Sequence, residues 1–268
     1  MFLTWTAAPS RWAVGFLVVG IAGCTTISPR EPRSSLPPNA PSLATILTAL
    51  GQNDEKVDHF RAEGVFTIQT PASDAVQRFH NSVVAFRRPA DLYVAGRTRA
   101  GLLGIRLVYA NNTMLLELPS EGRRELRRNP DTFLGIGPKL SPETLIRELF
   151  LSEGWAERGD GAVRMVAFDE ARTTVVLEIG PRRRPRQRVE VTGPDWRVVK
   201  NELLQRGQVI ATITKTDYCD VDGVAFPGVV KAMLPQEKIW MEFRLRSVSI
   251  NAGVEARWFS IENDEGLP

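Results

Sequence analysis

The chain has 268 residues, of which 43% are hydrophobic and 24% are charged, and its formal net charge at pH 7 is +3. This ordinary composition excludes a disordered, collagen-like or coiled-coil protein, and the small excess of positive charge does not by itself indicate nucleic-acid binding. Two Cys and two His residues are too few for a disulfide scaffold and poorly suited to a structural zinc site.

The N-terminal residues predict a secretory signal. Arg11 precedes an uncharged run over residues 12–23, and the run ends in small residues. A membrane-spanning helix needs roughly 20 apolar residues, so this run is too short to be a stable anchor by itself. A basic residue, a short apolar core and small residues at its end are typical of an exported chain, and we expect a signal peptide over residues 1–23.

Residues 24–41 predict a tether. They contain repeated Pro residues among Ser and Thr, and almost no side chain that could enter a core. Such a segment is extended, with partial polyproline character, and holds a folded part away from a membrane. We expect the folded domain to cover residues 42–268.

Two helices are expected in this domain. Ser42 is suited to cap a helix that runs to about Gln52 and has one apolar face. Ser141 is suited to cap a second helix, in which Pro142 fits the first helical position and the Glu143 carboxylate complements the positive end of the helix dipole.

Most of the remaining sequence predicts strands, because apolar and polar residues alternate with a period of two. Asn111 and Asn112 both tolerate positive φ, which predicts a tight two-residue hairpin between strands over residues 105–110 and 113–118. Further strands are expected over residues 65–69, 79–86, 92–96, 163–168, 173–179, 188–192, 196–204, 209–218, 224–234, 238–250 and 258–261.

The order of these elements predicts the fold class. The strands follow one another at hairpin spacing and are interrupted by only two helices, without the strand-helix-strand repeat of a parallel sheet. We therefore expect a mainly β (α+β) fold, a single highly curved antiparallel sheet or unclosed half-barrel with a few covering helices. A curved sheet of this size can hold a ligand where helices close its concave side.

The end of the signal peptide resembles the bacterial lipobox, because Ile21, Ala22 and Gly23 precede Cys24. The resemblance implies cleavage before Cys24, attachment of diacylglycerol to its thiol, and acylation of the new amino terminus. An ordinary secretory signal with a chance cysteine is the alternative. Because Thr25 follows Cys24, the retention aspartate of inner-membrane lipoproteins is missing, and the resemblance favours an anchor in the outer membrane, facing the periplasm.

Five segments, in this order along the chain, resemble the LolA/LolB family of periplasmic lipoprotein carriers and membrane-anchored receptors. They are Phe60–Phe66 (FRAEGVF), Arg88–Tyr93 (RPADLY), Gly101–Gly104 (GLLG), Ser141–Leu151 and Val221–Pro227 (VDGVAFP). The resemblance implies an unclosed antiparallel half-barrel whose helical lid holds acyl chains in an apolar cavity. It also implies lipid or lipoprotein acyl chains as ligands, a periplasmic carrier protein as partner, and a receptor role in outer-membrane localisation.

Leu102 and Leu103 lie between Gly101 and Gly104, at the place where the receptor of this family has an exposed apolar residue used in delivering lipoprotein to the membrane. The resemblance therefore implies a membrane-insertion or transfer loop at these two leucines. Adjacent exposed leucines are costly without a function. The alternative is that one of them packs beneath the edge of the sheet.

Two clusters of arginine are candidate contact surfaces. The first is interpreted either as a contact for anionic lipid headgroups or an acidic partner, or as a solvated hairpin turn whose charges prevent edge pairing. The second surrounds Glu125 and is expected to be an exposed strand. The first cluster comprises Arg182, Arg183, Arg184, Arg186 and Arg188, and the second comprises Arg123, Arg124, Arg127 and Arg128.

The sequence predicts no catalytic residue, metal site, cofactor or nucleic-acid partner. The acidic residues that end at Asp222 do not have the spacing of a calcium loop, and no nucleophile or phosphate-binding motif is present. Once Cys24 is acylated, Cys219 has no internal partner, and we expect it to be buried or half-buried at a strand end. Two functions fit: an envelope lipoprotein that binds lipid or acyl chains, and a structural lipoprotein that docks envelope proteins.

Overall fold

A computed structural model describes residues 36–70, 73–130, 141–151, 163–236 and 238–261. The chain divides into two units, Met1–Arg33 and Ser34–Pro268, and all described residues belong to the second. The expected signal peptide, Cys24 and most of the expected tether therefore lie outside the described residues.

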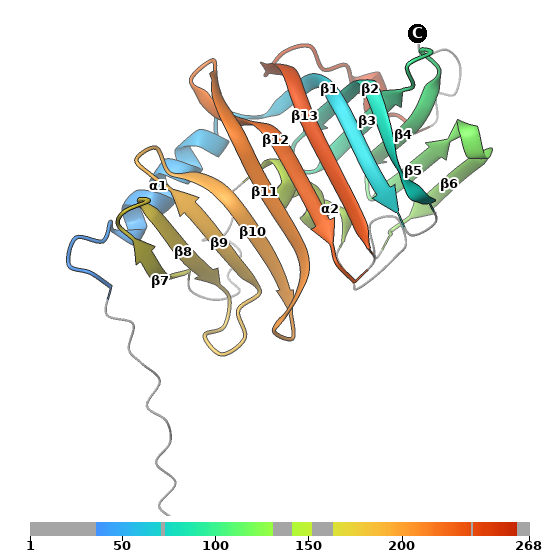
Figure 1. Ribbon diagram of the computed structural model, residues 1–268. Helices are drawn as coiled ribbons and strands as arrows, with labels where there is room; N and C mark the ends of the chain where they lie inside the picture. Colours follow the sequence, from blue (N-terminus) through green and yellow to red (C-terminus); the bar gives the residue numbers. More distant parts are fainter. Residues whose placement is uncertain (1–35, 71–72, 131–140, 152–162, 237, 262–268) are drawn as a thin grey trace, which may run out of the picture. The chain divides into compact units, whose positions relative to one another are not determined.

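Thirteen strands form one antiparallel sheet in the order β6-β5-β4-β3-β2-β1-β13-β12-β11-β10-β9-β8-β7 (Figure 1). Each strand pairs with the next one along the chain, except that β6 and β7 do not pair and form the two edges of the sheet. The two halves of the sheet are joined by the pairing of β1 with β13. The strands are β1 (His59–Thr70), β2 (Ser73–Arg87), β3 (Asp91–Arg97), β4 (Leu103–Ala110), β5 (Thr113–Leu118), β6 (Arg123–Arg128), β7 (Arg164–Asp169), β8 (Thr174–Ile179), β9 (Gln187–Thr192), β10 (Arg197–Gln205), β11 (Gln208–Val221), β12 (Val224–Leu234) and β13 (Ile239–Ile250). The prediction of a single unclosed antiparallel sheet is confirmed.

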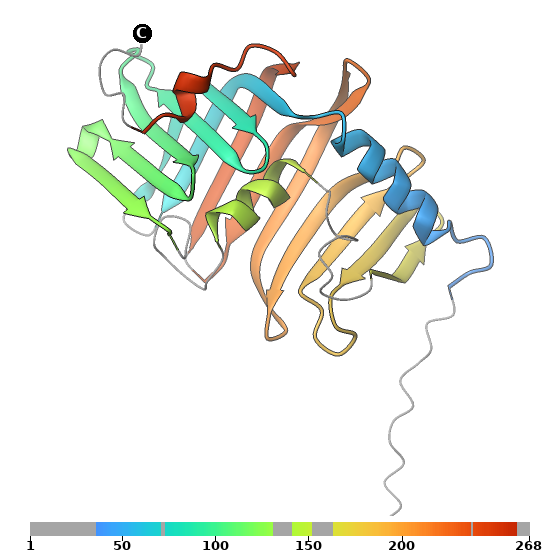
Figure 2. The same cartoon turned by 180° about the vertical axis from the view of Figure 1, so that it is seen from behind.

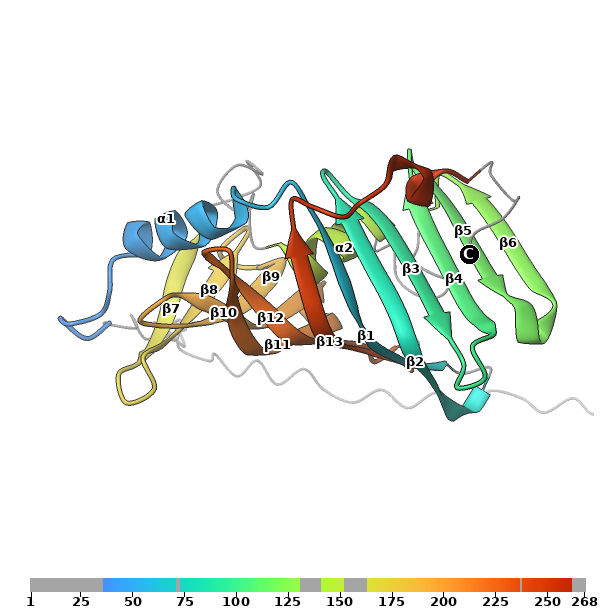
Figure 3. The ribbon, with the colours of Figure 1, turned by 90° about the horizontal axis from the view of Figure 1, so that it is seen from above.

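The sheet is twisted and bent across its width (Figure 3). Several strand pairs contain register shifts, for example between Glu63 and Gly64 on β1, and such bulges bend a strand and increase its twist. Gly64 is required at its position, because a side chain there would collide with the backbone carbonyl of Arg244 on β13.

Two helices lie on the same side of the sheet (Figure 2), as expected. They are α1 (Leu43–Asp54) and α2 (Pro142–Phe150). Both predicted caps are confirmed, since the Ser42 hydroxyl accepts from the Thr45 amide at 3.1 Å and the Ser141 hydroxyl accepts from the Thr144 amide at 3.2 Å. No helix in the described ranges is long and apolar enough to cross a membrane.

We call the side covered by the helices the inner face. α1 packs Ile46 and Leu50 against strands β8 to β10, in a core separate from the one under α2. The α2 core is built around Phe60 of β1, whose ring lies 5.0 Å from that of Phe150 on α2 and 4.9 Å from that of Phe226 on β12. These ring contacts attach α2 to the middle of the sheet.

The opposite side, the outer face, has its own apolar cluster on β2 to β5, which Phe259 covers. Phe259 ends a 3-10 helix, η3 (Ala256–Phe259), so the strand expected over residues 258–261 is wrong. β13 is already paired on both sides, by β1 and β12, and the segment after it finds no free edge at this point of the sheet. The segment packs instead on apolar side chains of the outer face and removes them from water.

The predicted Asn111-Asn112 hairpin is confirmed. Both residues have positive φ, 49° and 56°, and Ala110 pairs with Thr113 on either side of them. This conformation matches the twist of the flanking strands, which is why Asn serves at both positions. A further short 3-10 helix, η1 (Pro119–Glu121), leads into the edge strand β6.

Candidate functional site: an apolar pocket under α2

An apolar pocket lies between α2 and the inner face of the sheet. Its lining comes from β1, β3, β4, β5 and β13, with Leu149 as the contribution of α2. The lining residues are Phe66, Ile68, Leu92, Val94, Ile105, Leu107, Leu116, Leu149, Met241 and Phe243. Since every one is an apolar residue, this surface has no side chain that could fix a polar ligand.

The pocket is small in this conformation. Its cavity volume is about 20 Å³, which is room for about one water molecule, whereas ligand pockets usually have about 300–1,000 Å³. The side chain of Leu149 occupies the side that α2 closes. A chain-like ligand therefore needs more room than the pocket has in this conformation.

Polar contacts hold the C-terminal part of α2 to the sheet. The Asn201 side-chain amide on β10 donates to the Glu148 carboxylate at 2.6 Å, and both residues are 1% exposed. Lys215 of β11 donates to the Leu151 carbonyl at 3.4 Å. Burial lowers the pKa of the Lys215 ammonium, and the nearby carboxylates of Asp54 and Glu148 oppose this shift. α2 thus joins an apolar pocket to a buried polar cluster.

A second cavity, of about 30 Å³, lies between α1 and strands β10 to β12. Its polar side chains bond to the protein itself. The Tyr218 hydroxyl donates to the Val198 carbonyl at 2.7 Å, and the Asn53 side chain bonds to both the amide and the carbonyl of Ala225, at 2.8 and 3.2 Å. The Asn53 bonds fasten α1 to β12, whereas the Tyr218 bond joins β11 to β10. These bonds leave little capacity for a ligand.

The structure separates the two candidate leucines. Leu102 is 69% exposed in the loop between β3 and β4, whereas Leu103 begins β4 and is half-buried. Gly101 has φ 81°, which favours glycine, and the Thr98 amide bonds to the Leu102 carbonyl at 2.9 Å. The loop thus presents one leucine to solvent, and a role for it in membrane contact stays a prediction.

We predict that Leu102→Glu changes the free energy of unfolding by no more than about 0.5 kcal/mol, because the side chain makes few contacts that folding creates. Leu107→Glu, which places a carboxylate in the apolar pocket, should instead prevent stable folding. Urea midpoints of the two variants check this. A large loss of stability from Leu102→Glu would show that this leucine is part of the core.

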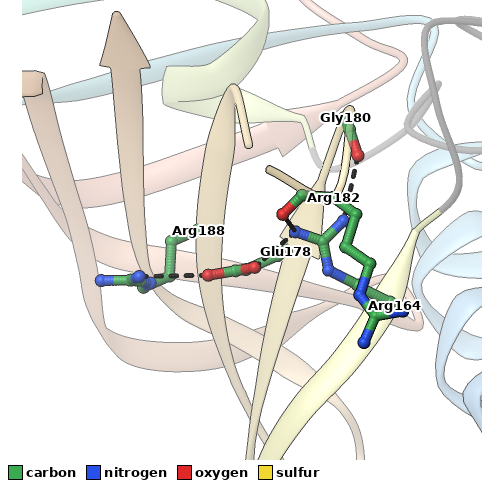
Figure 4. A network of polar contacts seen from close by, with 5 residues as sticks. All are labelled: Arg164, Glu178, Gly180, Arg182 and Arg188. Carbon is green, nitrogen blue, oxygen red and sulfur yellow. Dashed lines mark hydrogen bonds and ion pairs between the residues drawn. The ribbon is translucent and has the colours of Figure 1, made fainter. Parts of the chain in front are cut away.

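The first arginine cluster occupies the loop between β8 and β9, together with the first part of β9. Glu178 lies between Arg188 and Arg164, at 3.1 and 2.6 Å (Figure 4). Burial would raise the pKa of Glu178, but the hydrogen bonds from Arg188 and Arg164 outweigh burial and lower it. Arg164 also donates to the backbone carbonyls of Gly180 and Arg182, each at 3.1 Å, and so braces the loop. Arg188 is therefore an internally paired strand residue.

The remaining arginines of this cluster lie outside β9. Arg182, Arg183 and Arg184 are exposed at the tip of the loop, and Arg186 is exposed just before β9. The hairpin turn was predicted, but the reason given for its charges is wrong, because β8 and β9 each have a neighbour on both sides and are not edge strands. Contact with anionic lipid or an acidic partner stays a prediction.

The second cluster is the edge strand β6, as expected of an exposed strand. Arg123 and Arg127 both bond to Glu125, and Arg124 pairs with Glu117 at 3.1 Å. These hydrogen bonds also lower the pKa of Glu125, against the effect of burial. Arginines on an edge strand hinder pairing with another chain, and three of these four pair with the carboxylates of Glu117 or Glu125.

The expectation for Cys219 is wrong, because this residue is exposed. In a regular strand, Cys219 would share the buried face of Lys215, four residues earlier. Asp217, between them, has φ 55°, which interrupts the alternation of β11. The period of two therefore does not extend to the end of this strand.

Comparison with known structures identifies the fold. At TM-scores of 0.53, 0.52 and 0.52, the chain is similar to an outer membrane lipoprotein-sorting protein domain from Vibrio parahaemolyticus, a DUF1329 family protein from Desulfovibrio piger and a LolA superfamily protein from Nitrosomonas europaea. Identities are 15%, 13% and 12%, and the matches cover 80%, 81% and 82% of this chain and 94%, 95% and 98% of those chains.

No protein-family model matches the sequence, and no curated protein matches it. The likeness is thus one of structure, and it establishes that the chain has the LolA-like fold.

Proposed function

We propose that this chain is a lipid-anchored binding protein of the bacterial cell envelope, not an enzyme, and that it holds lipid or lipoprotein acyl chains between the sheet and α2. In this proposal the acylated Cys24 anchors it in the outer membrane, facing the periplasm. A periplasmic carrier protein delivers its cargo. The LolA-like fold supports this assignment.

The observation that carries the proposal is the pocket lined by apolar residues alone. An acyl chain has no polar group along its length, so it loses no hydrogen bonds in such a site and gains about 0.8 kcal/mol for each CH₂ that leaves water. The chain would take the place of Leu149 as α2 moves outward. The exposed Leu102 would meet the membrane during transfer.

The small volume of the pocket favours a second candidate function. A sheet whose inner face is filled by its own side chains can act as a docking module for envelope proteins without carrying lipid. The two functions differ in whether α2 leaves the sheet. Only the first requires a closed state that opens.

Lipid capture tests the proposal directly. Native mass spectrometry of the unit Ser34–Pro268, purified from a bacterial envelope, should show co-purified lipid, and a fluorescent fatty acid should bind at one site. This unit is suitable because every described core residue lies within it. Absence of both bound lipid and probe binding would overturn the proposal and leave the docking function.

Leu149→Ala should increase the affinity for the fluorescent fatty acid while it lowers stability. Truncating a buried leucine costs about 2–5 kcal/mol of folding free energy. Because this side chain fills the pocket, its loss removes part of the cost of opening, and each 1.4 kcal/mol removed tightens binding about tenfold.

Leu115→Ala is the matched control for this variant. Leu115 is as buried as Leu149 but lies in the outer-face cluster, away from the pocket. Its truncation should lower the urea midpoint to a similar degree without tightening probe binding. Equal changes in affinity for the two variants would show that general loosening, not the pocket, governs binding.

A further inference from the structure

A cluster of positive charge lies on the outer face, where β2, β13 and the loop between β3 and β4 meet. Arg99 of the loop donates from Nε to Nε2 of His80 at 3.2 Å. Arg246 of β13 donates to the backbone carbonyls of His80 and Gly64, at 2.6 and 3.4 Å. Arg78 lies two residues before His80 on β2, and its charge acts on the His80 ring.

This charge is not neutralised within the described part of the chain. No ion pair there joins Arg78, Arg99 or Arg246 to a carboxylate, in contrast to the arginines of β6 and to Arg188. Partial desolvation lowers the pKa of His80, and the charged groups that lower it further are Arg99, Arg78 and Arg246. Like charges held this close repel one another, and an anion from outside the chain would relieve that repulsion.

Exposed apolar residues lie in the same loop as Arg99, on the same strand as Arg78 and on β12, the strand next to β13. Leu102 is three residues after Arg99 in one loop, and Val76, 53% exposed, is two residues before Arg78. Met233, 48% exposed, lies near the end of β12. These are three of the four large hydrophobic residues that the described part of the chain exposes. Cationic and apolar groups thus occur together.

The topology places the β3–β4 loop, which holds Arg99 and Leu102, at one end of the sheet, whereas His80 and Arg246 lie farther along β2 and β13. Because neighbouring strands are antiparallel throughout, the β1–β2, β3–β4, β8–β9, β10–β11 and β12–β13 connections all lie at the same end. We call it the loop end; in Figure 1 it is the lower side of the sheet. The exposed tip of residues 182–184 belongs to it as well.

We propose that Arg78, Arg99, Arg246 and His80 form a phosphate site through which the loop end docks on an anionic phospholipid bilayer, with Leu102 entering the acyl region. Guanidinium groups bind phosphate oxygens with paired, charge-assisted hydrogen bonds. Apolar side chains beside a cationic patch are the composition of a surface that rests in a membrane interface. The inference rests on the proposed function in one respect, namely that a protein that carries lipid has to meet a membrane.

Binding to vesicles tests the site. The unit Ser34–Pro268 should bind vesicles of phosphatidylglycerol and phosphatidylcholine, and bind pure phosphatidylcholine weakly, with affinity falling as salt rises. R78Q/R99Q should weaken binding to the anionic vesicles roughly 25-fold, because each basic residue near an anionic membrane surface usually contributes about 1 kcal/mol to the binding free energy. Arg246 is kept because its backbone contacts hold the strands together. Unchanged binding by R78Q/R99Q would overturn the proposal.

R172Q/R257Q is the matched control, since it removes the same number of positive charges. Arg172 lies in the β7–β8 turn at the opposite end of the sheet, and Arg257 lies in η3 beyond β13. Each pairs with an exposed carboxylate, Asp169 or Glu255. This control should keep nearly the full vesicle affinity. An equal loss in both variants would mean that only net charge matters, and no phosphate site exists.

Histidine NMR gives a readout at the site itself, because the chain has two histidines and His59 lies at the far end of β1. An anion bound among the arginines should raise the pKa of His80, and the resonances of His59 serve as the internal reference. A rise with anionic vesicles supports docking. A rise with inorganic phosphate but none with vesicles would show a site for free anions and overturn the membrane proposal, as would no shift with either.

The fatty-acid probe separates this proposal from the function on which it rests. R78Q/R99Q should bind the probe as the wild type does, because the phosphate site is on the outer face and the pocket is on the inner face. Vesicle binding without probe binding would remove the carrier function and keep the docking site. Probe binding without vesicle binding would do the reverse.

Discussion

Replacing Cys24 with Ser should abolish acylation of this protein and release its mature form from the detergent phase. The thiol is the proposed acceptor of diacylglycerol, and a hydroxyl at this position does not take its place in the lipobox chemistry. Each buried CH₂ contributes about 0.8 kcal/mol to anchoring, so loss of several acyl chains changes partitioning from nearly complete retention to nearly none. Incorporation of labelled palmitate and detergent-phase partitioning measure the effect.

The substitution should leave the folded unit intact. Every described core residue comes after Ser42, and we expect the substitution to leave the packing among these residues unchanged. The urea midpoint of a chain that includes position 24 should be the same with Cys or Ser there. A wild-type chain that takes up no palmitate and partitions like the variant would contradict the lipoprotein proposal.

Local chemistry made most of the fold predictable. Ser42 and Ser141 are the N-caps of the two helices, and Asn111 and Asn112 adopt the positive φ that their hairpin requires. Each of these features depends on residues within about four positions of one another, and such interactions can be predicted from the local sequence. Hairpin spacing then leads to an antiparallel sheet.

Features that depend on distant residues were not predictable. Glu148 and Asn201 are 53 residues apart and meet only because α2 crosses β10. The arginines around His80 come from two strands and a loop, and no local spacing joins them. Cys219 is exposed because of one backbone angle at Asp217. These three features depend on how distant segments pack and on local backbone geometry.

Part of the candidate site was predictable only in outline. A glycine-bounded pair of leucines indicated a loop with an exposed apolar residue, but only the structure distinguishes the exposed Leu102 from the half-buried Leu103. The run of arginines indicated a turn, whereas the neutralisation of Arg188 by Glu178 depends on the pairing of β8 with β9. Sequence identifies which groups are present; the register determines which remain available to a partner.

Phe60→Ala should lower the free energy of unfolding by about 3–5 kcal/mol, a larger loss than Leu115→Ala or Leu149→Ala should cause, because the phenylalanine ring leaves a larger cavity. The side chain is fully buried, and its ring stacks on that of Phe86 at 5.6 Å besides its edge contacts with Phe150 and Phe226. Alanine would leave a cavity at the point where α2, β2 and β12 meet. Urea unfolding, followed by tryptophan fluorescence, measures the change.

Met233→Ala and Phe60→Leu are the controls for this variant. Met233 is half exposed at the loop end, and its truncation should change stability by about 0.5 kcal/mol or less. Phe60→Leu keeps much of the apolar volume and should recover more than half of the loss. A cost below about 1 kcal/mol for Phe60→Ala would show that the ring cluster does not hold α2 on the sheet. In that case the polar contacts of Glu148 and Lys215 would be the main attachment of α2, and acyl-chain entry would depend on breaking them.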